Sequence, residues 1–203
     1  MRIDVDEEPA TFLGEYGRIP IAFEISRIYD VARAAGNRNE FTVSERAVEK
    51  PVIKDYDSAV DDAPVNWKNR FDISRWGLLA ARADGRHVGG AAVVFREPEV
   101  HMLEGRSDMA VLWDIRVAPD MRGLGVGSAL LEAAVRWSAK RGATLLKVET
   151  QNTNVPACRF YARKGFLLRD ANQFAYPLFP DEIQLLWFKE LMPHKRRPQG
   201  RPD

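Results

Sequence analysis

The stretch VLWDIRVAPDMRGLGVGSA, residues 111–129, decides the fold of this chain. Its first part, residues 111–117, alternates apolar with other side chains and is rich in branched ones, which predicts a strand that ends before Pro119. The alternation would place three side chains on one face of that strand: Trp113, Ile115 and Val117. Asp114 would then point to the opposite face.

A glycine-rich turn follows this strand and leads into a predicted helix. Apolar residues recur at helical spacing from Ala129 to Trp137, and Gly142 stands where a glycine commonly ends a helix. The first N–H groups of a helix lack partners, the helix dipole adds positive charge there, and glycines let a phosphate approach closely. We therefore predict a phosphate site made by seven residues: Arg122, Gly123, Leu124, Gly125, Val126, Gly127 and Ser128. The side chain of Arg122 is a candidate to add positive charge.

Three phosphate-binding motifs compete for this turn. A dinucleotide fingerprint needs glycine or alanine where Ser128 stands, and an acidic residue at the end of a second strand. A P-loop needs a lysine before its serine or threonine, and residues 122–128 contain none. The third motif, Arg-x-x-Gly-x-Gly after a strand, fits residues 122–127 and resembles motif A of the GNAT acetyltransferases, whose loop holds the pyrophosphate of acetyl-coenzyme A.

A second segment at the right separation extends the resemblance. Residues 145–149 (LLKVE) look like the next strand of the GNAT fold, and the following N-x-x-A-x-x-F-Y-x-K-x-G-F pattern is matched by Asn154, Ala157, Phe160, Tyr161, Lys164, Gly165 and Phe166. The segments LLKVETQNTNVPACRFYARKGF and QFAYPLFPDEIQLLWFKEL are similar to the streptothricin-acetyltransferase-type branch. The resemblance covers about residues 67–191. It implies an α/β (α+β) fold, the GNAT acyl-CoA N-acyltransferase fold, with a mixed, mostly antiparallel sheet and flanking helices.

The resemblance also implies how acetyl-CoA, the expected cosubstrate, would bind. In the family the pantetheine arm lies along the central strand, so the main chain of Ile115, Arg116 and Val117 should bind it, with the Val117 N–H near the thioester carbonyl. A gap between this strand and residues 145–149 would give the arm room. Asn154 and Ala157 are expected beside the arm, although Asn154 also suits a helix cap.

Acetyl transfer to an amine needs groups that move protons. By resemblance, Tyr161 donates a proton to the leaving thiolate and lies against the cofactor; its alternative role is a packed aromatic residue. An alkyl ammonium has a pKa of about 10.4, so a carboxylate should help to remove its proton. Glu149 and Asp114 are the candidates. Each could instead only bind the ammonium group, or pair with Arg116 or Lys147.

Length and composition fit one domain. The chain has 203 residues, of which 45% are apolar, and we expect one domain over residues 1–192, with an arm and hairpin over about 1–53 and a disordered basic tail over 193–203. A net charge of +1 argues against nucleic acid as a partner. No apolar run reaches the length of a membrane span, and the acidic N-terminus does not resemble a signal peptide.

The cysteine and histidine residues limit which disulfides, nucleophiles and metal sites the chain could contain. The single cysteine, Cys158, rules out an internal disulfide and, buried in a helix without a basic partner, is not expected to be a nucleophile. A lone thiol and the lack of a leader predict a cytoplasmic protein. The three histidines, His87, His101 and His194, show no ligand spacing, so no metal is expected.

Periodicity predicts an N-terminal arm and hairpin. We expect residues 1–18 to be irregular and residues 19–31 and 41–52 to form two paired strands, the second broken by Pro51. The apolar spacing within residues 19–31 also fits a helix, and the strand is preferred for its alternation.

Residues 54–64 carry several aspartates and little apolar content, which predicts a loop or lid. It is either simply solvated or gathers a cationic substrate. A short helix over residues 65–74 would present Trp67, Phe71 and Ile73 to the interior.

Residues 78–83 and 87–96 form the clearest predicted hairpin, because Asp84-Gly85 is a strong type I′ turn signal. Gly89 and Gly90 inside the second strand indicate a bulge or a close approach of another backbone.

The C-terminal part predicts one helix and three strand segments. The helix is capped near Asn154, has Pro156 in its first turn, and runs to Lys164 before Gly165. The strand segments cover residues 166–168, 174–176 and 183–191, the first two as one interrupted strand. The last is dense in apolar residues and should be central in the sheet, whereas an exposed last strand would indicate a homodimer.

The sequence thus predicts transfer of acetyl from acetyl-CoA to a primary amine of a small cationic acceptor, by direct attack, with streptothricin as the branch-level candidate. Two other functions fit the same residues: a coenzyme A sensor without turnover, and a protein or peptide N-acetyltransferase. A peptide acceptor would need an open groove, so a lid from residues 54–64 or 177–183 would argue against it.

Overall fold

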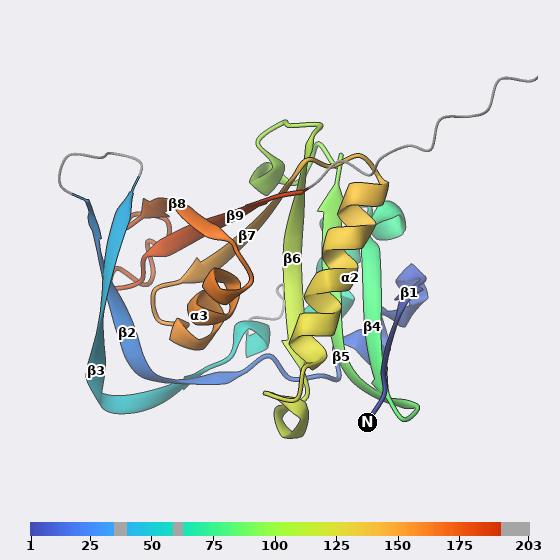
Figure 1. Ribbon diagram of the computed structural model, residues 1–203, viewed down its shortest axis with the longest axis horizontal. Coiled ribbons are helices and arrows are strands. Elements are labelled where there is room, and N and C mark those ends of the chain that lie inside the picture. Colours follow the sequence, from blue (N-terminus) through green and yellow to red (C-terminus); the bar gives the residue numbers. More distant parts are fainter. Residues whose placement is uncertain (35–39, 59–62, 192–203) are drawn as a thin grey trace, which may run out of the picture.

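The computed structural model describes residues 1–34, 40–58 and 63–191. Seven strands form one sheet in the order β1-β4-β5-β6-β7-β9-β8. Their bounds are β1 Ile3–Glu8, β4 Gly77–Ala83, β5 Arg86–Phe95, β6 Met109–Val117, β7 Leu145–Gln151, β9 Gln184–Glu190 and β8 Leu167–Asn172. All neighbours are antiparallel except β6 and β7, which are parallel. The predicted mixed, mostly antiparallel sheet is confirmed (Figure 1).

Two helices flank one face of the sheet. Helix α2 (Val126–Lys140) packs across β4, β5 and β6, and α3 (Val155–Arg163) lies beside β7 and β8 (Figure 1). Under α2 lies one hydrophobic cluster that includes Leu79, Val93 and Leu130. The other face carries a second cluster, built by short segments: α1 (Leu13–Tyr16) and the 3-10 turns Pro64–Asn69, Ile73–Arg75 and His101–Leu103.

The N-terminus is ordered, so the prediction of an irregular arm over residues 1–18 is wrong. Strand β1 pairs with the edge of β4, from Ile3 opposite Ala83 to Glu8 opposite Leu78. Acidic residues hide its alternation, yet Ile3 and Val5 pack against the α2 cluster. Helix α1 follows and buries Tyr16 completely. Backbone hydrogen bonds to β4 supply the order that the local sequence lacks.

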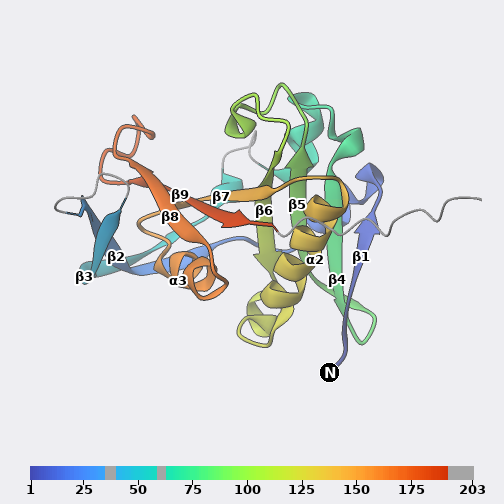
Figure 2. The same cartoon turned by 45° about the horizontal axis from the view of Figure 1, so that its top comes forward.

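The predicted N-terminal hairpin is confirmed. Strands β2 (Phe23–Arg33) and β3 (Phe41–Lys54) form a separate two-stranded sheet. It stands beside β8, β9 and α3, at the far end from β1 (Figure 2). Strand β3 continues past Pro51 because the register of the β2–β3 pairing shifts there. Pro51 lies in the unpaired part of β3, where its missing N–H does not interrupt the hydrogen bonds between the strands.

The β4–β5 hairpin also forms as predicted. Asp84 and Gly85 both have positive φ, 48° and 84°, as a type I′ turn requires. The close approach expected at the two glycines is real: a Cβ on Gly90 would lie 2.4 Å from the Tyr16 ring, and one on Gly89 would lie 2.7 Å from the Arg116 carbonyl oxygen.

At the C-terminus one strand prediction is wrong and one is confirmed. Strand β8 is continuous, and residues 174–176 are not part of it, because the Asn172 side chain accepts a hydrogen bond from the Phe174 N–H and starts a turn. Strand β9 lies inside the sheet, between β7 and β8, as its apolar density predicted. Because β9 is not an exposed edge strand, it gives no argument for a homodimer.

The short helix predicted over residues 65–74 is two 3-10 turns, and both Trp67 and Ile73 are buried as expected. The predicted tail over residues 193–203 lies outside the described residues. In the part of the chain that is described, no helix has the length and apolar character to cross a membrane.

Candidate functional site

The glycine-rich turn has the geometry of an anion site. Gly123 and Gly125 adopt φ of +79° and +94°, a region that other residues rarely enter. The first helical bond runs from the Ala129 N–H to the Gly125 carbonyl, at 3.0 Å. Within the described chain, no backbone carbonyl accepts from the amides of residues 125–128. These amides, at the start of a 15-residue helix, are therefore available to an anion.

Arg122 fastens this loop to the N-terminal segment. Its guanidinium donates to three carbonyl oxygens, those of Val117 at 3.2 Å, Pro20 at 3.4 Å and Ala22 at 3.0 Å. The side chain thus holds the loop in place, and its expected contribution of charge to a ligand stays a prediction.

A gap opens between β6 and β7 directly above the loop. The two strands pair only from Met109 opposite Leu145 to Leu112 opposite Val148. Beyond these pairs β6 continues to Val117 and β7 continues to Gln151, but the two strands no longer pair with each other and they diverge (Figure 1). The main chain of residues 115–117 therefore has one edge facing the gap, as the prediction for the pantetheine arm requires.

A bulge in β6 corrects the predicted faces of this strand. The pairing with β5 shifts register between Ala92 and Val93, so Trp113 is the extra residue. Trp113 packs with the second cluster, against Trp76 and Phe71, whereas Ile115 and Val117 pack against the α2 cluster. Trp113 therefore shares a face with Asp114 and Arg116, because the extra residue inverts the alternation.

Helix α3 carries Tyr161 in a buried position. The side chain is 3% exposed and makes edge contacts with Phe160 and Phe166, at ring distances of 5.3 and 5.4 Å. Burial, then the nearby charge of Asp114, raises the pKa of its phenol well above the ordinary value. The hydroxyl therefore stays protonated, so it holds a proton that could be donated, and the raised pKa makes it a weaker acid than a free phenol.

The start of α3 carries a side-chain cap and a buried thiol. The Asn154 side chain caps the helix by accepting from the Ala157 N–H at 3.2 Å, which confirms its predicted capping role. Cys158 is buried and interacts with the Thr150 hydroxyl at 3.3 Å, and burial raises the pKa of its thiol to about 11. This thiol is not a ready nucleophile, as expected.

Asp114 is paired. Its carboxylate accepts two hydrogen bonds from Arg116 and one from the Tyr16 hydroxyl, and the side chain is 8% exposed. The Arg116 guanidinium also binds Asp57, of the segment predicted to be an acidic lid. Burial would lower the pKa of Arg116, and the hydrogen bonds that it donates to Asp114 and Asp57 outweigh this effect, so the net shift of the pKa is upward. Asp114 therefore pairs with Arg116, which was the alternative to a role as a base in the sequence analysis.

Glu149 has a different environment. It accepts from the Tyr176 hydroxyl at 2.5 Å and from the Gln184 amide at 2.8 Å. Among the described residues no cationic side chain pairs with it. Lys147, the suggested partner, instead binds Glu104 and the Met102 carbonyl. The Glu149 carboxylate thus has neutral donors only and is available to pair with a cationic ligand.

Two loops meet over this side of the gap. The Lys54 ammonium binds the Glu182 carboxylate at 2.5 Å, which joins the end of β3 to the loop before β9. Two residues further along, the Tyr56 hydroxyl donates to the Gln151 side chain, at the end of β7. Residues 59–62, part of the predicted lid, lie outside the described residues.

Sequence reasoning missed the polar residues that surround Glu149. They are Tyr56, Gln151, Tyr176 and Gln184, together with Lys54, which forms the ion pair with Glu182. They belong to no motif, and Tyr56 and Gln151 are 95 positions apart, so nothing in the local sequence marks them.

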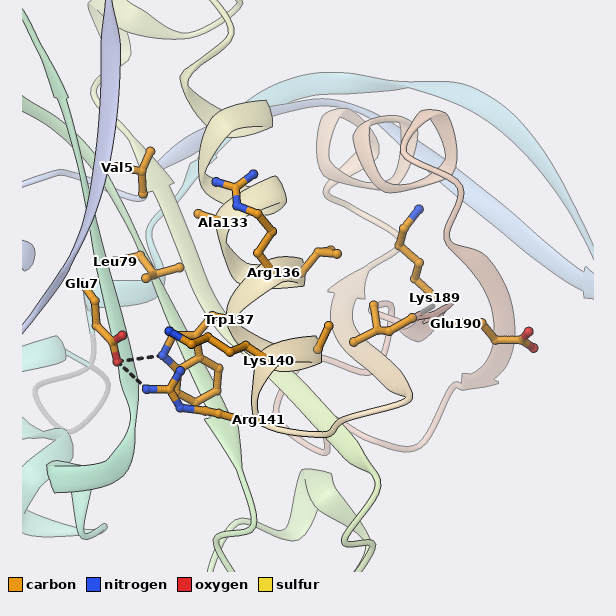
Figure 3. Close-up of a pocket in the computed structure, with 13 residues that line it drawn as sticks. Val5, Glu7, Leu79, Ala133, Arg136, Trp137, Lys140, Arg141, Lys189 and Glu190 are labelled. Atoms are coloured by element: carbon orange, nitrogen blue, oxygen red, sulfur yellow. Dashed lines mark hydrogen bonds and ion pairs between the residues drawn. The ribbon is translucent and has the colours of Figure 1, made fainter. Parts of the chain in front are cut away.

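A groove of about 780 Å³ runs beside the second half of α2 (Figure 3). Its walls include Val5, Leu79, Arg136, Lys140 and Leu191. Glu7 binds both the Trp137 indole and Arg141 across it, each at 2.8 Å (Figure 3). None of the predicted site residues lines this groove. Over the described ranges, 1–34, 40–58 and 63–191, no cluster of possible metal ligands occurs.

Comparison with known proteins identifies the family. Residues 43–166 match the family model described as "Acetyltransferase (GNAT) family", which is more than half of the chain. The chain therefore belongs to the GNAT acetyltransferase family.

The named relatives include streptothricin acetyltransferases and mycothiol acetyltransferases. Streptothricin acetyltransferase A of Bacillus subtilis (strain 168) is 40% identical over 81 residues, 39% of this chain and 47% of that protein. The chain thus spans about half the length of the curated relatives it matches.

Two solved structures show the same fold. A nourseothricin acetyltransferase has a TM-score of 0.72 and 23% identity, over 95% of this chain and 100% of that one. A Bacillus anthracis str. Ames protein, provisionally named a streptothricin acetyltransferase and solved in complex with acetyl coenzyme A, has a TM-score of 0.75 and 20% identity, over 93% and 99% of the two chains.

Proposed function

We propose that the protein transfers the acetyl group of acetyl-CoA to a primary amine of a small cationic acceptor, by direct attack of the amine. The observation that carries this proposal is the convergence of three features at one gap in the sheet. The amides of residues 125–128 lie at its base, the main-chain edge of residues 115–117 forms one side, and the Glu149 carboxylate lies at its far end.

Each feature has a task in the reaction. The loop amides hold the diphosphate of the cosubstrate, and the strand edge holds the pantetheine arm, with the Val117 N–H near the thioester carbonyl. We expect the arm to pass Asn154 and Ala157, at the start of α3. The amine nitrogen attacks the thioester carbon, the carbon–sulfur bond breaks, and Tyr161 gives its proton to the departing thiolate. The acylated nitrogen loses its surplus proton, which restores the Tyr161 phenol directly or through water.

Glu149 is the better of the two candidate carboxylates. Asp114 is already neutralised by Arg116 and is almost fully buried, so it would bind an ammonium group poorly. Glu149 has neutral donors only and is partly accessible, so it is available to pair with the acceptor. It would bind the ammonium group and accept its proton, directly or through water, before the attack.

The loops favour a small acceptor over a peptide. The Lys54–Glu182 ion pair joins the two segments that could close over the site, and a peptide would need that side open. The names of the relatives support streptothricin as the acceptor. We place the enzyme in the cytoplasm, where a lone unpaired thiol such as Cys158 stays reduced.

A thiol-release assay tests the proposal. Purified protein and acetyl-CoA are incubated with streptothricin, with linear polyamines and with lysine-containing peptides. We expect release of coenzyme A with the small cations, streptothricin foremost, and little with peptides. Calorimetry on the same sample should show binding of acetyl-CoA. Binding without turnover of any amine would instead identify a coenzyme A sensor, and no binding at all would refute the proposal.

A further inference from the structure

A continuous chain of hydrogen bonds runs from Tyr56 to Glu149. Tyr56 donates to the Gln151 side-chain oxygen, and the Gln151 amide donates to the Tyr176 hydroxyl oxygen at 2.8 Å. Tyr176 then donates to Glu149 at 2.5 Å. The chain links a tyrosine of the segment after β3 to the carboxylate that we assign to the acceptor.

The direction of every bond in this chain follows from its last member. The Glu149 carboxylate can only accept, so the Tyr176 hydroxyl uses its one proton there. Tyr176 must then accept from the Gln151 amide nitrogen, which turns the Gln151 side-chain oxygen toward Tyr56, and the Tyr56 hydroxyl donates to it. All donors therefore point toward the carboxylate.

The chain also keeps its phenols protonated. Burial raises the pKa of Tyr176, and the negative charge of Glu149 raises it further. Burial likewise raises the pKa of Tyr56. Neither phenol loses its proton near neutral pH, so Tyr176 is a permanent donor to Glu149. Together with the Gln184 amide, it engages one lone pair on each carboxylate oxygen and leaves the others for a ligand.

We propose that Tyr176 is a positioning residue, which, held by Gln151 and Tyr56, orients the Glu149 carboxylate to receive the ammonium group of the acceptor. This inference rests on the proposed function and goes beyond it, because it assigns the acceptor subsite to residues of three separate segments: residues 54–58, the end of β7 and the loop before β9. The Lys54–Glu182 ion pair joins the end of β3, where residues 54–58 begin, to the loop before β9. Its removal should loosen the subsite without touching Glu149.

The test is the variant Tyr176→Phe, which keeps the ring and removes one hydroxyl. We expect the KM for the best acceptor to rise about tenfold, since a hydrogen bond to a charged group has been lost. The KM for acetyl-CoA and kcat at saturating acceptor should stay within about twofold. Gln184→Met removes the second donor and should act in the same direction. Tyr29→Phe is the matched control, a half-buried tyrosine outside the chain, and should leave both KM values unchanged.

A double-mutant cycle separates positioning from simple structural damage. In a Glu149→Gln background, Tyr176→Phe should have no further effect on the acceptor KM. An equal effect in both backgrounds would overturn the inference, as would a rise in the KM for acetyl-CoA in parallel with that for the acceptor.

Crystal structures provide a readout that needs no turnover. The Glu149 carboxylate should change its orientation in Tyr176→Phe and keep it in Tyr29→Phe. An unchanged carboxylate in Tyr176→Phe would overturn the inference even if the wild-type protein acetylates amines. Absence of turnover by the wild-type protein would count against the proposed function instead.

Discussion

The guanidinium of Arg116 meets the carboxylate of Asp114 through two hydrogen bonds, at 2.9 and 2.7 Å, although the two residues are only two positions apart in β6. The same guanidinium binds Asp57 and the Ile19 carbonyl, at 2.8 and 3.0 Å from its Nη1. One buried cation thus holds the central strand, the segment before β2 and the segment after β3 together. The end of β6 nearest the candidate site is therefore held by an ion network, in which Arg116 is the partner of Asp114.

Removal of this cation should destabilise the protein. Arg116→Met leaves Asp114 and Asp57 without their shared counter-charge, and an uncompensated buried charge typically costs about 3–5 kcal/mol of unfolding free energy. Arg2→Met, which breaks the exposed pair with Asp4, is the control and should cost at most about 1 kcal/mol. Urea unfolding of the three proteins measures both. Similar losses in the two variants would show that the network contributes no more than a surface pair.

The loop glycine Gly125 should be required for cofactor binding. Its φ of +94° costs an L-residue about 1–2 kcal/mol, so Gly125→Ala should distort the turn and weaken acetyl-CoA binding by about tenfold or more. Gly14→Ala is the matched control, because its Cβ would meet nothing within 4 Å and its φ is not positive. Calorimetry with acetyl-CoA compares them. Equal affinity in all three proteins would contradict the role given to the loop.

Tyr161→Phe should slow the reaction with little loss of binding. The ring contacts with Phe160 and Phe166 remain, so acetyl-CoA affinity and thermal stability should be nearly unchanged. Loss of a general acid typically costs about a hundredfold or more in rate. Steady-state kinetics and calorimetry on the same preparation separate the two quantities. A kcat within a few-fold of the wild type would leave Tyr161 a packing residue only.

Alkaline pH should destabilise the protein partly through Cys158. Its thiol titrates near 9.0 when exposed and at about 11 in the fold, so the folded state holds its proton longer. The stabilisation is complete below pH 9 and is lost as the pH rises from 9 to about 11, by at most about 3 kcal/mol. The unfolding free energy of Cys158→Ala should therefore fall less steeply over this range. Parallel slopes for the two proteins, in chemical unfolding at pH 8 and 10.5, would contradict this.

The cofactor side of the site was predictable from the sequence. A helix start is a local feature, and the positive φ of Gly123 and Gly125 and the cap at Asn154 depend on residues a few positions apart. The same holds for the Asp84-Gly85 turn. Strand β1 was not predictable, because its order comes from pairing with β4, some seventy residues later in the chain.

The sequence by itself determined the family, the phosphate-binding turn, most helices and strands, and the candidate catalytic residues Tyr161, Glu149 and Asp114. These depend on side-chain type and on spacing within one turn of helix or one strand. Only the tertiary structure shows how the two carboxylates differ, because the partners of a carboxylate are its neighbours in space. Asp114 accepts hydrogen bonds from Arg116, which also binds Asp57, next to the bulge at Trp113. Glu149 is partly accessible and accepts from Tyr176 and Gln184, two neutral donors that come from distant parts of the sequence.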